Sequence, residues 1–186
     1  MMTARFRLTH LGLVLATLFS PIFLMGCPLP PQTVSFVDLE RYTGLWYQIA
    51  AYPQFFSRGL VAITAQYSLN EDGTVAVFNR GLEGDFDGEE STIEGTARIV
   101  DEDSNAKLAV RFDFPLGGLF EGEYWIIALD EEDYTYAVVS DSTKRSLFIL
   151  SRTPSMDQQV LDEILADLEA RGYDLDKLEY TPQQTP

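Results

Sequence analysis

The sequence predicts an all-β domain: an eight-stranded antiparallel up-and-down barrel with one C-terminal α-helix packed on its wall. Eight short segments of alternating apolar and polar residues follow one another, with turn residues between them. Most connections have hairpin length, so sequential strands should pair antiparallel, and closure removes the exposed sheet edges. Trp46 opens the first segment and Arg152 ends the last, and the two can stack only if the sheet closes on itself.

Composition sets the limits within which this barrel must fold. The 186 residues are 46% hydrophobic and 12% aromatic, enough for one domain with a sizeable core. The chain has 29 acidic and 13 basic side chains, and its formal net charge of -16 repels nucleic acid and anionic lipid headgroups. We therefore expect no nucleic-acid partner. Cys27 is the single cysteine, which excludes an intrachain disulfide.

Residues 1–26 have the pattern of a lipoprotein signal peptide. Two arginines precede an apolar run at 11–19, and the stretch ends in Leu24-Met25-Gly26-Cys27. The similarity to lipoprotein signals implies that Cys27 becomes the first mature residue and is acylated, which would hold the protein on a membrane. The alternative is a retained membrane helix, which Pro21 and a run shorter than ~20 residues disfavour.

Removal of this signal would limit the available chemistry. His10, the only histidine, would be lost, and lipid would block Cys27. Nucleophilic Ser-His or Cys-His machinery and His or Cys metal sites would then be absent from the mature monomer. We expect no enzyme, no metal and no cofactor.

Residues 27–40 are predicted to be a Pro-rich tether between the lipid and the domain. Such a segment prefers the extended polyproline conformation and acts as a semi-rigid spacer. Pro28 follows the cysteine in place of the Asp that resembles an inner-membrane retention signal. This favours the outer membrane, with the domain facing the periplasm.

The eight strands follow the tether in order. They are expected at residues 46–52, 61–69, 74–80, 91–100, 107–112, 123–129, 134–140 and 146–152. In the fifth segment the apolar set Leu108, Val110 and Phe112 alternates with Lys107, Ala109 and Arg111. An apolar lumen inside a charged wall is the reverse of a porin, so the barrel should sit in water.

One amphipathic helix is expected at about 155–171, before Gly172. Ser155 with Gln158 fits a capping box at its start. Its apolar stripe consists of Val160, Leu161, Ile164, Leu165 and Leu168. This side should pack on the barrel wall; a role in binding a partner or a membrane surface is an alternative that the acidic polar face disfavours. A short strand at Leu178–Thr181 could lie beside the first.

An ordered set of motifs runs through the domain. It consists of Gly44-Leu45-Trp46-Tyr47, Thr64-Ala65-Gln66-Tyr67-Ser68-Leu69, Asp72-Gly73, Asn79-Arg80-Gly81, Glu94-Gly95-Thr96-Ala97, Asn105-Ala106-Lys107-Leu108, Tyr124-Trp125-Ile126 and Ile149-Leu150-Ser151-Arg152-Thr153-Pro154. The set closely resembles the lipocalin family, in detail its bacterial outer-membrane lipoprotein branch. The resemblance implies a lipocalin domain at 41–183 with its barrel at about 44–152. It also implies that Trp46 plugs the closed end of the barrel and that Arg152 lies across the Trp46 ring. Gly44 is expected at the same closed end.

Alternation, together with the inward pattern of the resembled family, predicts the cavity wall. The predicted ligand-binding residues are Ala50, Tyr67, Val77, Asn79, Gly95, Val110, Phe112, Tyr124, Ile126 and Phe148. Small residues recur on the inward face and leave volume for a cavity; the alternative is a barrel plugged by its own side chains. Polar groups on this face need partners, which a ligand headgroup or ordered water could supply.

Two loops at the expected mouth of the barrel have residues that suggest a function, a lid in one and a calcium site in the other. Phe55 and Phe56 lie in the loop 53–60, where lipocalins place a lid, and they either cap the core or gate ligand entry. The acidic loop 85–90 invites a calcium interpretation, but its spacing does not match an EF-hand, so a solvated turn is preferred.

These features predict a membrane-anchored lipocalin that binds, stores or carries a small hydrophobic ligand. The membrane holds two-chain lipids by both chains, whereas one acyl chain binds it only marginally, so the expected cargo is a lysophospholipid or a fatty acid. The alternatives are a lipocalin-like enzyme that acts on a lipid and an envelope scaffold that binds nothing. The oligomeric state is left open.

Overall fold

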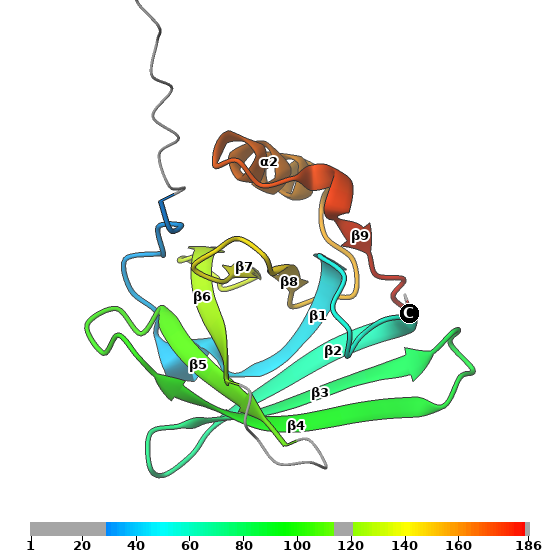
Figure 1. Ribbon diagram of the computed structural model, residues 1–186, viewed down its shortest axis with the longest axis horizontal. Coiled ribbons are helices and arrows are strands. Elements are labelled where there is room, and N and C mark those ends of the chain that lie inside the picture. The colour runs from blue at the N-terminus through cyan, green and yellow to red at the C-terminus, as the bar shows by residue number, and fades with distance from the viewer. Residues whose placement is uncertain (1–28, 114–120, 185–186) are drawn as a thin grey trace, which may run out of the picture.

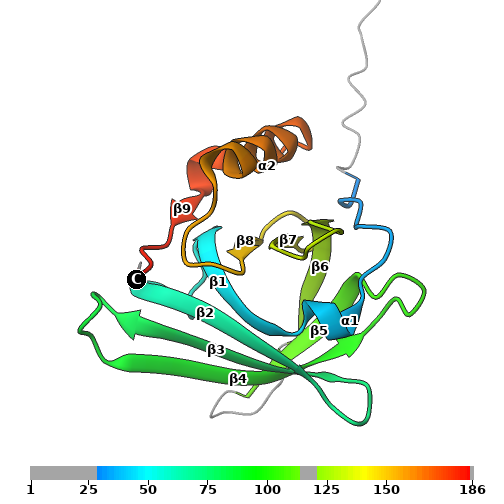
Figure 2. The same ribbon diagram turned by 180° about the vertical axis from the view of Figure 1, so that it is seen from behind.

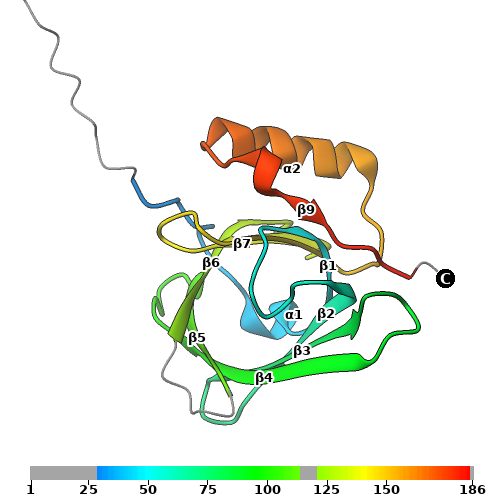
Figure 3. The ribbon, with the colours of Figure 1, turned by 45° about the vertical axis from the view of Figure 1, so that its right-hand side comes forward.

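Eight strands form a closed antiparallel barrel in the computed structural model, which describes residues 29–113 and 121–184 (Figure 1). The strands are β1 (Gly44–Ala51), β2 (Leu60–Leu69), β3 (Val75–Glu83), β4 (Glu90–Ile99), β5 (Lys107–Phe112), β6 (Glu121–Leu129), β7 (Tyr136–Ser140) and β8 (Leu147–Ser151). Each pairs with the next, and β1 pairs with both β8 and β2, which closes the ring seen in Figure 3. The predicted architecture is confirmed; the predicted signal peptide and Cys27 lie outside the described residues.

Strand bounds differ from the prediction mainly at the turns. β3 continues to Glu83, beyond the expected end at 80, because Gly81 and Leu82 still pair with β4. β7 begins at Tyr136, two residues later than expected. The reason is Tyr134, whose φ of 56° places it in the left-handed region, which a continuous strand cannot accommodate.

A bulge in β1 reverses the inward and outward faces of that strand. Gln48 pairs with Leu150, but Ala50 pairs with Ile149, so one residue is skipped between them. Ala50 therefore faces the same side as Ile149, in the apolar cluster outside the barrel. The prediction that Ala50 faces the lumen is wrong; Ala51, paired with Phe148, takes the inward position.

Two helices cover the barrel at different places. The short α1 (Leu39–Tyr42) lies across one end, and α2 (Gln158–Ala170) lies against the outer wall (Figure 2). Leu161, Ile164 and Leu168 of α2 are buried against outward side chains of the barrel, which confirms the predicted packing.

The start of α2 corrects the predicted capping box. The helix begins at Gln158, and the side chain of Asp157, not Ser155, accepts hydrogen bonds from the amides of Gln159 and Val160. A carboxylate at this position satisfies two free helix N–H groups and complements the helix dipole. The helix ends as expected before Gly172, which has a φ of 79°.

The C-terminal segment fills a gap between β1 and β2. The two strands pair only from Gly44 to Tyr47 along β1. Beyond this point β9 (Glu179–Tyr180), preceded by the 3-10 helix η1 (Leu175–Lys177), pairs with β1 instead. The Gln183 amide then donates to Gln48 O at 2.8 Å and to Ile63 O at 2.9 Å, joining the separated strands.

The described residues include no helix long and apolar enough to cross a membrane.

Candidate functional site

Trp46 and Arg152 close one end of the barrel, as the sequence predicts. Trp46 is fully buried, and its indole N–H donates to Tyr42 O at 2.8 Å. The Arg152 guanidinium lies 3.8 Å from the centre of the Trp46 ring and donates to Leu45 O at 2.9 Å. Gly44 has a φ of 96°, and a Cβ there would lie 3.3 Å from Arg152 Nη1, so glycine suits both the backbone and the contact.

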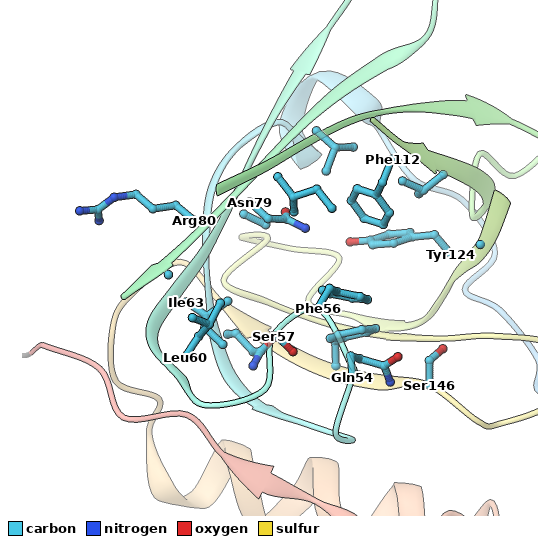
Figure 4. Close-up of a pocket in the computed structure, with 18 of the residues that line it drawn as sticks. Gln54, Phe56, Ser57, Leu60, Ile63, Asn79, Arg80, Phe112, Tyr124 and Ser146 are labelled. Atoms are coloured by element: carbon cyan, nitrogen blue, oxygen red, sulfur yellow. The ribbon is translucent and has the colours of Figure 1, made fainter. Parts of the chain in front are cut away.

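Above this closed end the barrel encloses a cavity of about 910 Å³. Seven of the ten predicted ligand-binding residues line it: Tyr67, Val77, Asn79, Val110, Phe112, Tyr124 and Phe148. They come from β2, β3, β5, β6 and β8, whose alternation turns one side of each strand inward (Figure 4). The barrel is therefore not plugged by its own side chains, which was the alternative interpretation.

The remaining three predicted residues do not line the cavity. Ala50 lies outside the wall because of the β1 bulge. Ile126 is fully buried in the packed core of the barrel. Gly95 pairs with Phe112, and a Cβ built on Gly95 would lie 2.7 Å from Arg111 O and 3.0 Å from Cδ1 of the Phe112 ring. The backbone of β5 and the Phe112 ring thus occupy the space that a side chain at position 95 would need.

Three tyrosine hydroxyls form a chain at the cavity floor. The hydroxyl oxygens of Tyr42 and Tyr124 lie 2.8 Å apart, and the Tyr124 hydroxyl donates to Tyr67 Oη at 3.1 Å. Burial raises the pKa of Tyr67 to about 12, and burial likewise raises the pKa values of Tyr42 and Tyr124 well above their usual value. All three are therefore neutral hydrogen-bonding groups at physiological pH. Tyr42 belongs to α1, which the alternation of the strands could not predict.

The loop between β1 and β2 carries two phenylalanines at the mouth of the cavity, one turned inward and one largely exposed. The Phe56 ring lies 5.7 Å from the Phe112 ring and lines the cavity with it. Phe55 also borders the cavity but is 69% exposed. A hydrogen bond from Gly84 N to Gly59 O ties this loop to the β3–β4 connection. Phe56 thus roofs the cavity, in the place where the sequence predicts a lid.

Charged residues also border the cavity. Five are acidic, namely Glu94, Asp113, Glu121, Glu123 and Asp141, and the Glu121 carboxylate is paired with Arg98 at 2.7 Å. Two are arginines. Arg80 points away from the cavity in Figure 4 and bonds to Glu90 at 2.6 Å, whereas Arg145 has no ion pair with any described residue. The sequence analysis did not identify Arg145. Within 29–113 and 121–184 no group of three or more His, Cys, Asp or Glu side chains could hold a metal ion.

Sequence comparison finds relatives over most of the chain. The family model of the lipocalin-like domain matches residues 37–183. Outer membrane lipoprotein Blc of Vibrio cholerae is 37% identical over 160 residues, which cover 86% of this chain and 91% of that protein. The protein of the same name from Escherichia coli K12 is 40% identical over 159 residues, covering 84% and 86%. Apolipoprotein D of Mus musculus is 36% identical over 163 residues, covering 84% and 82%.

Solved structures show the same fold at lower identity. Insecticyanin from the tobacco hornworm Manduca sexta superposes with a TM-score of 0.68 at 20% identity, covering 86% of this chain and 87% of that one. Apocrustacyanin C2 superposes with a TM-score of 0.62 at 18% identity, covering 84% and 91%. With a closed eight-stranded barrel, a Trp-Arg closure and a family match over nearly the whole described domain, the chain belongs to the lipocalin-like family.

Proposed function

We propose that this protein binds and carries a single-chain lipid in its barrel cavity, held on the outer membrane by acylated Cys27 with the domain facing the periplasm. The observation that carries the proposal is the cavity of about 910 Å³, which lies in the range of natural small-molecule sites. Val77, Val110 and Phe148 contribute apolar surface to it. The name outer membrane lipoprotein, borne by relatives up to 40% identical, supports the anchoring.

The competition with the bilayer supports a cargo with one chain. Each buried methylene gains ~0.8 kcal/mol, and it gains this in the bilayer as well as in the barrel. A lipid with two chains is therefore retained by the membrane, whereas a lipid with one chain is held only marginally. A carrier with a cavity of this size therefore competes best for lipids with one chain.

The charges at the mouth support a zwitterionic headgroup. Five acidic residues border the cavity, against two arginines of which Arg80 is already paired with Glu90, so a free fatty-acid anion meets net repulsion there. A lysophospholipid with a phosphate and an ammonium can place its phosphate near Arg145 and its ammonium near the carboxylates. We therefore favour a lysophospholipid over a fatty acid.

A blocked cavity tests the proposal directly. Ile93 lines the cavity from β4, whereas Phe78 lies on β3 and is 37% exposed on the outer wall. We expect Ile93→Trp to abolish lysophospholipid binding in a fluorescence displacement assay and Phe78→Trp to leave it unchanged.

Native mass spectrometry of the protein after gentle extraction should show a lipid adduct, lost in Ile93→Trp. Absence of any adduct or binding would favour the scaffold alternative, and turnover of the lysolipid by the purified protein would favour an enzyme.

A further inference from the structure

The tyrosine chain at the cavity floor leaves one proton without an acceptor. Each of the three hydroxyls carries one hydrogen, and the chain contains two hydrogen bonds. Since Tyr124 donates to Tyr67, Tyr42 must donate to Tyr124, and the hydrogen of Tyr67 remains unused. No side chain or carbonyl among the described residues accepts it, although Tyr67 lines the cavity.

Asn79 presents a second unused group on the same surface. Its Oδ1 is buried and has no hydrogen-bond partner among the described residues. Figure 4 shows Asn79 and Tyr124 extending toward each other from opposite sides of the cavity. Tyr67 pairs with Val77, two residues before Asn79, so Tyr67 and Asn79 are diagonal neighbours on one face of the sheet. Rotation of the amide exchanges its oxygen and nitrogen, so Asn79 can offer either an acceptor or a donor.

The floor is suited to a neutral group. Desolvation is the main cause that raises the pKa values of all three tyrosines, so the floor disfavours any anion there. Arg152, the cation whose charge acts on Tyr42 and Tyr67, already donates to the carbonyl oxygens of Leu45 and Arg41. A carboxylate at this depth would have no cation to pair with, whereas a hydroxyl would cost little to bury once it is hydrogen-bonded.

We propose that the cargo carries a neutral oxygen, a hydroxyl, at its inner end, hydrogen-bonded at the floor by Tyr67 and Asn79. This inference rests on the proposed function and adds to it a second polar contact, opposite the headgroup. The hydroxyl would accept from Tyr67 and donate to Asn79 Oδ1, which completes both unused groups. A cargo that ends in a plain methyl group would leave the Tyr67 hydroxyl and Asn79 Oδ1 without hydrogen-bond partners. Buried polar groups without partners make binding less favourable.

A matched pair of probes tests the inference. The two probes are an unsubstituted fatty acid and the fatty acid of the same length with a hydroxyl on its terminal carbon, each titrated into the full-length protein by isothermal calorimetry. We expect the wild type to bind the hydroxylated probe at least as tightly as the plain one. In Asn79→Leu and in Tyr67→Phe the ratio of the two affinities should shift toward the plain probe by about 10-fold to 100-fold.

The variants provide the controls. Tyr67→Phe removes a single oxygen and keeps the ring, so it still tests the inference if Asn79→Leu fails to fold. Gln54→Leu removes a polar group that lines the cavity at the mouth and should change both affinities alike. Tighter binding of the plain probe by the wild type, with a ratio that the variants do not alter, would overturn the inference and leave the carrier function standing. Binding of neither probe nor a lysophospholipid would overturn the proposed function itself.

Discussion

Replacement of Arg152 by lysine should destabilise the barrel markedly while keeping its positive charge. Besides its stacking on Trp46, the guanidinium joins segments that are far apart in the chain. It donates to the carbonyl oxygens of Leu45 (2.9 Å), Arg41 (2.7 Å), Tyr42 (3.2 Å) and Tyr134 (3.2 Å). A lysine ammonium is a compact point charge and can retain about two of these four hydrogen bonds.

The expected loss follows from these contacts. Each lost hydrogen bond contributes about 1 kcal/mol net, and desolvated stacking over Trp46 adds about 1 kcal/mol. Arg152→Lys should therefore lower the free energy of unfolding by about 3 kcal/mol. With a urea dependence of about 2 kcal/mol per molar, the unfolding midpoint should fall by about 1.5 M.

Urea unfolding followed by tryptophan fluorescence measures this shift. The matched control is Arg111→Lys, since Arg111 lies exposed on β5 and its side chain makes no hydrogen bond with a described residue. A surface change of this kind should stay within about 0.5 kcal/mol of the wild type. Equal midpoints for Arg152→Lys and Arg111→Lys would refute the reasoning that the planar guanidinium holds the closed end together.

Three further predictions concern other parts of the fold. Asp157→Ala should lower the free energy of unfolding by about 1 kcal/mol, because the α2 amides lose their cap; Asp162→Ala, within the same helix, is the control in thermal unfolding. Gln183→Ala should lower the free energy of unfolding by about 1 to 2 kcal/mol, because it removes the two hydrogen bonds by which the Gln183 side chain joins β1 to β2; an unchanged urea midpoint would contradict the bridging role. Hydrogen bonds, first that of Thr135, lower the pKa of Asp130 below its ordinary 3.8, so its contribution is present above that value and is lost as the pH falls through the lower folded pKa. Asp130→Asn should flatten the fall of unfolding free energy in this acid range, measured by urea titration at successive pH values.

Local patterns were sufficient to predict the architecture and most of the cavity wall. Alternation with a period of two is a property of each strand by itself, and together with the inward pattern of the resembled family it identified Tyr67, Val110 and Phe148 as inward residues. Hairpin-length connections fixed the order of pairing, and Trp46 with Arg152 indicated closure. Each of these signals depends only on residues close together in the chain or on a contact that closure imposes.

Packing between distant segments decided the rest. Ala50 faces outward because the pairing of β1 with β8 skips one residue, and no property of the β1 sequence alone reveals a bulge. The floor of the cavity depends on Tyr42 from α1 reaching Tyr124, a residue 82 positions later in the chain. The unused groups of Tyr67 and Asn79 likewise become evident only after every other hydrogen bond has been counted. Sequence alone thus determined which strands form and that they close around an apolar interior, whereas the tertiary structure determined where polar groups remain without partners, because hydrogen-bond satisfaction depends on all neighbours in space.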